Sequence, residues 1–170
     1  ESGKAVMNMA EFDIQEILKQ LEAGFSTQAE ANGLTFAITA HELRHEWLCG
    51  DKGGVIQILG NLLSNAIKYT SDGGIVSLDV FELDQTSGNY AKLCFRVKDN
   101  GIGIPKDSLK LIWNRFYKTD LSRGKDKKGT GLGLSIAKEI IQSHNENINV
   151  VSTEGVGTEF IFTLEKASKV

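Results

Sequence analysis

Three polar residues share one face of the helix expected over residues 51–69. Asn61, Asn65 and Lys68 are spaced at i, i+4 and i+7. At about 100° per residue they fall within about 60° of one another. Amide oxygens are hard ligands of the kind that Mg²⁺ prefers, and a lysine reaches phosphate as a point charge. The spacing indicates a metal and phosphate site, and a solvated helix face is the plain alternative.

Two glycine-rich segments add candidate nucleotide contacts. Asp99-Asn-Gly-Ile-Gly103 follows an expected strand, and Gly129-Thr-Gly-Leu-Gly133 leads into an expected helix. Glycines let a backbone approach a ligand closely, and a helix N-terminus offers free N–H groups to phosphate. Neither segment fits the Rossmann fingerprint, and residues 124–130 lack the lysine of a Walker A loop. Ordinary turn chemistry is the alternative for each segment taken alone.

The hydrophobic pattern predicts the elements that position these residues. Helical spacing predicts helices over residues 11–31, 51–69 and 134–144. Alternation predicts strands over residues 34–39, 75–83, 91–98, 149–152 and 159–164. Asp51 is expected to cap the second helix. The fold class that follows is α+β, a two-layer sandwich with helices on one face of a mixed, mostly antiparallel sheet.

Five motifs resemble those of the sensor histidine kinases, and they occur along the chain in that family's order. Residues 61–69 resemble the asparagine box, and residues 112–118, between the two glycine segments, resemble the phenylalanine box. The glycine segments and residues 157–160 resemble the three glycine boxes. The resemblance covers about residues 11–165. It implies the Bergerat ATP-binding fold, with residues 1–10 as the remnant of a junction with a missing dimerisation domain and residues 166–170 as a tail.

The resemblance implies a role for each residue of the helix stripe. Asn65 matches the family's Mg²⁺ ligand, and Asn61 matches the companion asparagine that helps to hold metal and phosphate. Lys68 would meet the phosphates and Tyr69 would border the nucleotide. Asn61, Asn65 and Lys68 are therefore the expected catalytic set.

The resemblance also implies a base-binding end. Asp99 matches the aspartate that accepts a hydrogen bond from the adenine amino group, and an ionised carboxylate, which only accepts, would reject the carbonyl of guanine. Gly101 and Gly103 would let the backbone pass close to the base, Ile104 would pack against it, and Thr158 would lie near it. A turn aspartate and a strand threonine are the plain alternatives for Asp99 and Thr158.

Charge is unevenly distributed along the chain. The formal net charge is −3, yet residues 1–85 sum to −8 and residues 86–170 to +5, and residues 106–128 alone carry +5. The resemblance makes residues 105–128 an ATP lid, so this charge would face a triphosphate. Lys118 and Arg123 match lid positions that contact phosphate. The remaining expected ATP contacts come from the second glycine box: Gly129, Thr130, Gly131, Leu132 and Gly133.

The phenylalanine box contributes one further expectation. Phe116 matches a residue that packs the lid hinge and meets the partner domain. A phenylalanine buried in the core is the plain alternative.

The activity that the resemblance implies is phosphoryl transfer from Mg·ATP to a histidine on a separate helical dimerisation domain. The other expected partner is the receiver domain of a response regulator. We expect a cytoplasmic, monomeric fragment without direct membrane contact, and the mildly acidic total argues against a nucleic-acid-binding surface. Cys49 and Cys94 lie beside apolar residues and are expected to be core thiols in a reducing compartment.

A histidine pair near residue 41 gives two misleading signals. His41-Glu-Leu-Arg-His45 matches the H-E-x-x-H signature of zinc proteases and also resembles a phosphoacceptor box. An alternating strand pattern precedes the motif where a zinc protease needs a long helix. His41 is also only 20 residues before Asn61, too close for the family's helical hairpin. Both readings are rejected.

Two further functions stay open. The chain could be another ATPase or kinase of the same fold, but hydrolytic members carry a glutamate base where this chain has Asn61, and an amide cannot act as a base. It could instead be a nucleotide-binding module that transfers no phosphoryl group.

Overall fold

The computed structural model describes residues 6–41, 43, 46–83, 92–118 and 131–167. The helices are α1 (Ile14–Ala31), α2 (Lys52–Lys68) and α4 (Gly133–Ser143), with a short 3-10 helix η1 (Lys106–Ser108). The strands are β1 (Met9–Asp13), β2 (Thr35–Ala40), β3 (Trp47–Asp51), β4 (Ile75–Leu83), β5 (Lys92–Asp99), β6 (Ile148–Thr153) and β7 (Gly157–Glu165).

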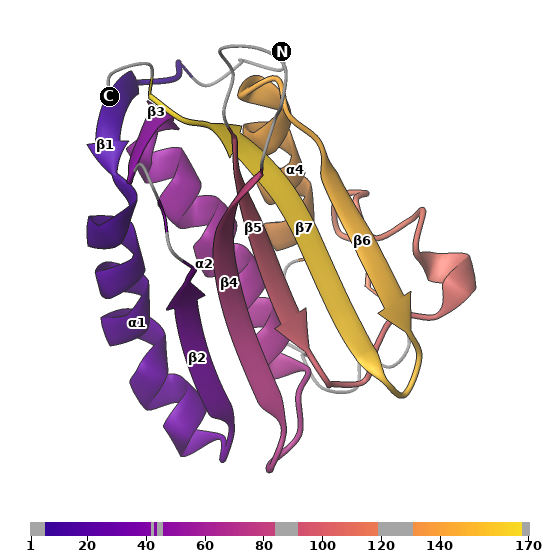
Figure 1. The fold of residues 1–170 in the computed structure, drawn as a ribbon. Coiled ribbons are helices and arrows are strands. Elements are labelled where there is room, and N and C mark those ends of the chain that lie inside the picture. Colours follow the sequence, from indigo (N-terminus) through magenta and orange to yellow (C-terminus); the bar gives the residue numbers. More distant parts are fainter. Residues whose placement is uncertain (1–5, 42, 44–45, 84–91, 119–130, 168–170) are drawn as a thin grey trace.

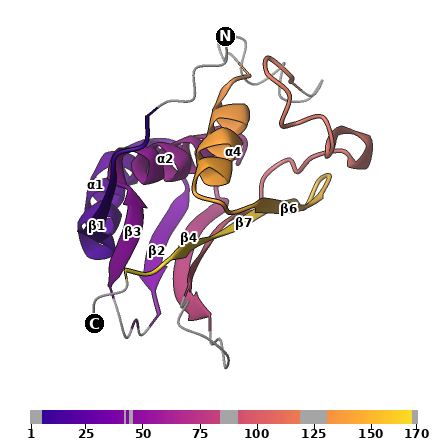
Figure 2. The same ribbon diagram turned by 90° about the horizontal axis from the view of Figure 1, so that it is seen from above.

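Five of the strands form one mixed sheet in the order β2-β4-β5-β7-β6. β2 runs parallel to β4, and the other neighbouring pairs are antiparallel. All three α-helices lie on one face of this sheet (Figure 1, Figure 2). The predicted α+β sandwich is therefore confirmed.

The core fills the space between the helices and the sheet. In α2 the buried side chains recur at helical spacing, which leaves the opposite stripe for polar residues. Phe95 of β5 stacks on Phe162 of β7 at 4.9 Å between ring centroids. The buried residues of α2 are Val55, Ile58, Leu59, Leu62, Leu63, Ala66 and Ile67.

A small second sheet corrects the predicted start of the first helix. β1 pairs with β3 in antiparallel fashion, and α1 begins only at Ile14, so residues 11–13 are strand where helix was predicted. Asp13 stays extended and its Oδ1 accepts a hydrogen bond from the backbone N–H of Gln15 at 2.9 Å, which caps the helix. Met9 and Ala10, assigned to the junction from sequence, take part in β1.

Lys166 and Ala167, assigned to the C-terminal tail from sequence, contact the small sheet. Lys166 bridges to Leu48 of β3, and the backbone N–H of Ala167 donates to Trp47 O at 3.0 Å. Lys166 Nζ lies 2.8 Å from Glu82 Oε1, with both side chains largely buried. These contacts tie the end of β7 to the small sheet.

Helix α4 is held to α2 near both of its own ends. The Asp51 carboxylate caps α2 by accepting from Gly54 N at 3.1 Å, as predicted. Asp51 N–H donates to His144 Nε2 at 3.0 Å, and His144 Nδ1 lies 2.8 Å from Ile140 O. Because that carbonyl only accepts and that amide only donates, the two contacts fit the tautomer in which Nδ1 donates and Nε2 accepts. At the start of α4, Asn61 Nδ2 donates to Gly133 O at 3.1 Å.

The turn after α4 is closed by an asparagine. Asn145 adopts φ +59°, and the N–H of Glu146 donates to Ile141 O at 3.2 Å. This is the Schellman arrangement, which Asn tolerates because its short side chain fits the left-handed region. The helix therefore ends in a regular turn without a glycine.

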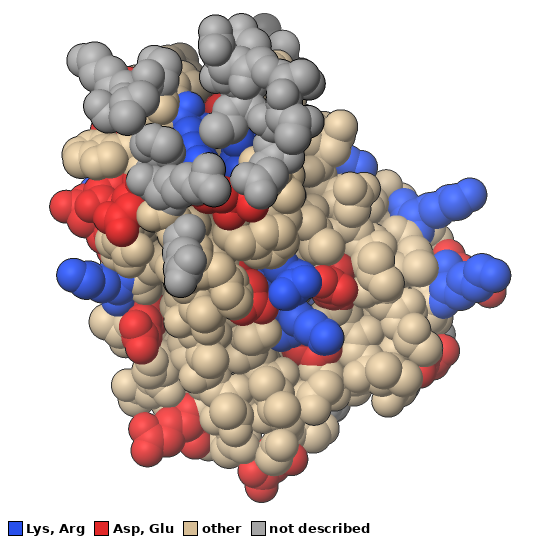
Figure 3. Space-filling model, in the orientation of Figure 1, with Lys and Arg blue, Asp and Glu red and all other residues tan. Residues whose placement is uncertain are grey.

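None of the helices in the described part of the chain lies on the opposite face of the sheet (Figure 1), and most of the visible described surface of that face is formed by residues other than Lys, Arg, Asp and Glu (Figure 3). At its centre Arg96 lies 3.5 Å from both Asp79 Oδ2 and Glu159 Oε1, and its guanidinium lies over the ring of Phe81. The glycine motifs and the polar stripe of α2 belong to the helical side, so the candidate site is built there.

Candidate functional site

The predicted polar stripe of α2 ends at the C-terminus of the helix. Lys68 is its last residue, and Tyr69, the C-cap, donates its N–H to Asn65 O at 3.0 Å. Asn61 and Asn65 are both half-buried. Asn61 uses one amide hydrogen on Gly133, whereas the Asn65 amide makes no hydrogen bond within the described part of the chain. The side-chain amide oxygens of both Asn61 and Asn65 therefore have no hydrogen bond in the described part of the chain and could meet a cation.

The second glycine segment lies against this stripe. A Cβ built on Gly133 would sit 3.8 Å from Asn61 Cβ, so the first turn of α4 passes directly over the asparagine. Leu132 precedes the helix, and its carbonyl accepts from Ser135 Oγ at 2.8 Å. Free N–H groups at the start of an 11-residue helix therefore lie beside the polar face of α2.

Gly131 joins this region to the phenylalanine segment. It adopts φ +72°, and its carbonyl accepts the N–H of Phe116 at 3.0 Å. A Cβ on Gly131 would approach the Phe116 carbonyl carbon to 2.7 Å, so only glycine fits.

Asp99, predicted from the sequence to contact the base, is the last residue of β5. It stands opposite Val76 on β4 and Thr158 on β7, on the helix-facing side of the sheet. Burial raises the pKa of the Asp99 carboxyl above its ordinary value, and hydrogen bonds from the backbone N–H groups of Gly101 and Thr158 act in the opposite direction. The result is a desolvated acceptor held in a fixed direction by backbone donors.

The first glycine segment folds back onto the end of α2. Ile102 N–H donates to Tyr69 O at 3.0 Å, and a Cβ on Gly101 would overlap that same oxygen. The segment therefore needs glycine at position 101 because backbone meets backbone there. This contact places Tyr69 next to the loop that follows Asp99.

The same loop is closed from the other side by the hairpin between β6 and β7. Gly103 has φ +69°, and a Cβ there would overlap Thr153 O. Ile102 O accepts the N–H of Gly155 at 2.7 Å. Ile104 follows, partly buried, and packs against the core. The predicted base-binding residues Asp99, Gly101, Gly103, Ile104 and Thr158 are thus brought together.

Ser152 is a member of this cluster that the sequence did not single out. It lies on β6 directly opposite Thr158, and its Oγ contacts Ile104 N, Gly157 O and Thr158 Oγ1 at 2.8, 2.9 and 2.8 Å. The sequence signal that could have identified Ser152 is the expected hairpin around residues 153–157, because pairing of its two strands sets Ser152 opposite Thr158.

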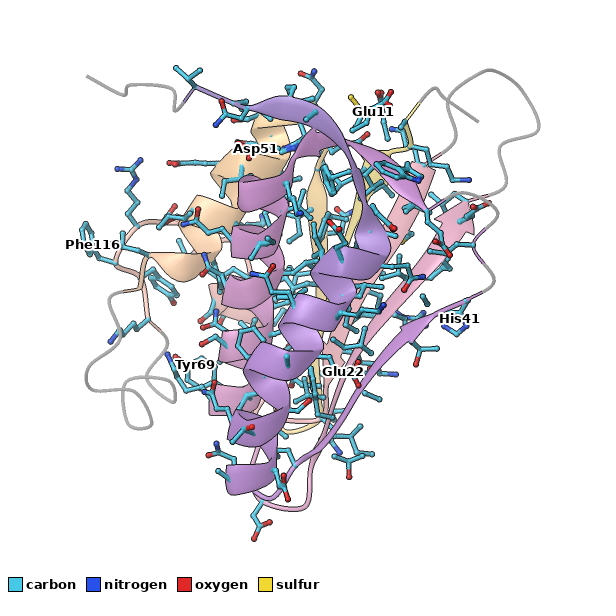
Figure 4. All side chains as sticks on the ribbon, turned by 90° about the vertical axis from the view of Figure 1, so that its left-hand side faces the viewer. Glu11, Glu22, His41, Asp51, Tyr69 and Phe116 are labelled. Atoms are coloured by element: carbon cyan, nitrogen blue, oxygen red, sulfur yellow. The ribbon has the colours of Figure 1, made fainter. Side chains whose placement is uncertain are left out.

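The phenylalanine segment is partly described. Trp113 packs edge-on against Phe160 at 5.8 Å between centroids, and Lys138 Nζ lies 5.2 Å from the Trp113 ring. Phe116 is 70% exposed, so it is not a core phenylalanine, and its backbone has φ +65°. It projects from the same side of the molecule as Tyr69 (Figure 4).

Some predicted phosphate contacts fall outside the described residues. Arg123, Gly129 and Thr130, and most of the predicted lid, lie in residues 119–130, and nothing further is said of them. Lys118 is the last described residue before this stretch and is partly buried.

His41 lies away from these residues. It follows β2, and its Nε2 is 3.3 Å from Asp79 Oδ1 on the helix-free face of the sheet. Figure 4 shows it on the side opposite Tyr69 and Phe116. The described residues hold no group of three or more His, Cys, Asp or Glu side chains that could bind a metal, and none of their helices is long and apolar enough to span a membrane.

Comparison with known proteins places these features in a family. Residues 50–168 match the profile of the histidine kinase-, DNA gyrase B- and HSP90-like ATPases. The chain is 45% identical to the sensor histidine kinase WalK of Bacillus subtilis (strain 168) over 116 residues, which cover 67% of this chain and 18% of WalK. It is 33% identical to the sensor histidine kinase YclK of the same strain, over 99% of this chain and 34% of YclK. The chain thus spans about a third or less of these curated relatives.

A solved structure shows the same arrangement of elements. Full-length ShkA in complex with AMPPNP superposes with a TM-score of 0.80 at 27% identity, covering 98% of this chain and 33% of ShkA.

Proposed function

The chain belongs to the family of histidine kinase-, DNA gyrase B- and HSP90-like ATPases, and on that premise we propose that it is the catalytic domain of a sensor histidine kinase. It would bind Mg·ATP and transfer the γ-phosphoryl group to a histidine on a separate dimerisation domain. The observation that carries the proposal is the meeting of the asparagine stripe of α2 with the start of α4 at one end and with the Asp99 loop at the other.

The base end would recognise adenine through hydrogen bonds of defined direction. Asp99 would accept from the adenine amino group, and its backbone donors leave the carboxylate little freedom to rotate away. Ile104 would pack on the base, while Gly101 and Gly103 keep side chains out of its plane. Tyr69 would border the nucleotide next to this loop.

The phosphate end fits a magnesium ion in its donor chemistry. Asn65 has an amide oxygen with no hydrogen bond in the described part of the chain, and oxygen is the ligand atom that Mg²⁺ prefers. Asn65 would hold the ion and Asn61 would support it, with Lys68 and Lys118 near the phosphates. When bound, Mg²⁺ would neutralise charge on the triphosphate.

The chain's own contribution to the reaction would be binding and orientation. Phosphoryl transfer needs the donor held in line and its charge offset, and the N–H groups at the start of α4 would serve both needs. A neutral histidine nitrogen is already a nucleophile, so this domain needs no base. Asn61 stands where hydrolytic relatives carry a glutamate, which favours transfer to a partner over attack by water.

The partners follow from the proposed reaction. The phosphoryl acceptor would be a histidine-containing dimerisation domain of the same full-length protein, and the next acceptor would be a response regulator receiver domain. The exposed Phe116 would contact the dimerisation domain. These events would take place in the cytoplasm.

Phosphoryl transfer to a supplied acceptor tests this function. The chain would be incubated with γ-labelled ATP, Mg²⁺ and dimerisation domains of sensor kinases, with an acceptor His→Ala variant as control. We expect acid-labile label on the acceptor histidine and slow release of free phosphate. Rapid phosphate release without labelling would support an ATPase, and nucleotide binding without either reaction would support a non-catalytic module.

A further inference from the structure

The hydroxyl of Ser152 makes more polar contacts than its single proton can serve. Its Oγ lies 2.8 Å from Ile104 N, 2.9 Å from Gly157 O and 2.8 Å from Thr158 Oγ1. A serine hydroxyl has one O–H donor and two lone pairs. The three contacts therefore constrain one another.

Only one assignment of protons satisfies all three contacts. Ile104 N–H can only donate, so it uses one lone pair of Ser152 Oγ. Gly157 O can only accept, so the Ser152 proton points to it. The contact with Thr158 is then a hydrogen bond only if Thr158 Oγ1–H donates to the second lone pair of Ser152.

This assignment decides what Thr158 can offer to a ligand. With its proton turned toward Ser152, Thr158 Oγ1 presents lone pairs alone. Asp99 stands directly opposite Thr158 on the neighbouring strand, and as a carboxylate it also only accepts. The two side chains together form an acceptor-only edge at the base-binding end.

We propose that Ser152 is a positioning residue for nucleotide specificity: it holds the Thr158 hydroxyl as an acceptor, so that the site favours an amino group over a carbonyl at carbon 6 of a purine. The inference rests on the proposed nucleotide-binding function. Without Ser152 the Thr158 proton becomes free to rotate and to donate to a carbonyl. The loss of Ser152 should therefore weaken discrimination more than it weakens binding.

Binding of ATP and inosine triphosphate tests the proposal, because inosine has a carbonyl in place of the amino group at carbon 6, with a proton on N1, and lacks the 2-amino group of guanine. Affinities would be measured by calorimetry for the wild-type chain, Ser152→Ala and Ser152→Thr. We expect the wild type to favour ATP and Ser152→Thr to retain that preference. In Ser152→Ala the ratio of the two affinities should fall by about two- to tenfold, which is the range of one net hydrogen bond.

Two further variants separate positioning from a general structural role. Thr163→Val also removes a strand hydroxyl that makes a hydrogen bond, to Glu146 Oε2 at 2.8 Å, and it should leave the preference unchanged. In a Thr158→Val background the Ser152→Ala change should no longer alter the preference for ATP, because the Thr158 hydroxyl through which Ser152 would act is absent. This background also supplies the test if Ser152→Ala alone does not fold.

The outcomes are distinct. Equal weakening of both nucleotides by Ser152→Ala, or an effect that persists without the Thr158 hydroxyl, would overturn the role of Ser152 and leave the proposed function standing. Failure of the folded wild type to bind either nucleotide would overturn the proposed function and this inference together.

Discussion

The base end and the phosphate end of the site are built in different ways. At the base end Asp99, Ser152 and Thr158 lie on neighbouring strands, and hydrogen bonds within the chain fix their directions. At the proposed phosphate end the side chain of Asn65 has no hydrogen bond in the described part of the chain. The proposed base end is pre-organised by contacts within the chain, whereas metal and nucleotide would complete the proposed phosphate end.

This difference predicts what each region controls. Changes at the base end should alter affinity, selectivity and stability, because the groups there already interact with one another. Changes at the phosphate end should alter the metal-dependent reaction and leave the fold almost untouched.

Asn65→Ala should lower Mg²⁺-dependent phosphoryl transfer by about 100-fold or more, the size of effect seen when a charge-stabilising group is removed. The thermal midpoint should stay within about a degree, since the Asn65 side chain makes no hydrogen bond to the described part of the chain that would be lost. The rate would be followed with labelled ATP. Asn149→Ala, an exposed asparagine on β6, is the matched control. A large loss of stability in Asn65→Ala would contradict the division.

Asp99→Asn should weaken ATP binding by about tenfold or more, because a hydrogen bond to a charged acceptor is lost. It should also raise the thermal midpoint at neutral pH. Burial raises the folded-state pKa of Asp99, so its contribution to stability is greatest below the unfolded pKa and is lost as pH rises through the folded pKa.

The difference in thermal midpoint between Asp99→Asn and wild type should therefore disappear as the pH falls below the ordinary pKa range of aspartate. There the carboxyl is protonated in both the folded and the unfolded state. Thermal scans from pH 3 to 8 measure it. Asp79→Asn, whose carboxylate pairs with Arg96, is the control and should not stabilise the protein. A difference in thermal midpoint that grows on acidification would mean that burial does not destabilise the ionised Asp99.

Gly101→Ala should destabilise the domain by about 1–3 kcal/mol, as overpacking does, because the new methyl group meets the Tyr69 carbonyl oxygen. ATP binding should fall with it. Gly24→Ala in α1 has no neighbour within 4 Å and should instead stabilise by up to about 1 kcal/mol. Denaturant titration compares the two, and equal effects would show that the loop does not rest on the end of α2.

Phe116→Gly should give the smallest change in stability, a gain of up to about 1 kcal/mol, since a non-glycine residue at φ +65° is strained and its exposed ring loses little packing. Phosphoryl transfer to the dimerisation domain should nevertheless fall while ATP affinity holds. Calorimetric unfolding and labelling measure the two. A marked loss of stability would show that Phe116 is packed.

Much of this arrangement could be predicted from the sequence because its signals are local. The period of the apolar residues in α2 separates the core stripe from Asn61 and Asn65, and the glycines mark places where backbone meets backbone, as at Gly101 and Tyr69. Asp51 was identified as a cap from its residue type and position alone.

The features that were missed depend on pairing between distant segments. β1 and β3 are five residues each, have mixed polarity, and are defined by their mutual register, with 33 residues between them. Ser152 gains its role only from standing opposite Thr158. The backbone contact between Phe116 and Gly131 likewise joins two motifs that are 15 residues apart, and the order of motifs does not reveal it.

Equilibrium binding of ATP to the wild-type chain and to Asp99→Asn, each with and without Mg²⁺, tests the proposed nucleotide site. We expect that the wild type binds ATP, that Mg²⁺ strengthens binding, and that Asp99→Asn binds weakly under both conditions. Failure of the folded wild type to bind ATP, or equal binding by Asp99→Asn, would contradict it.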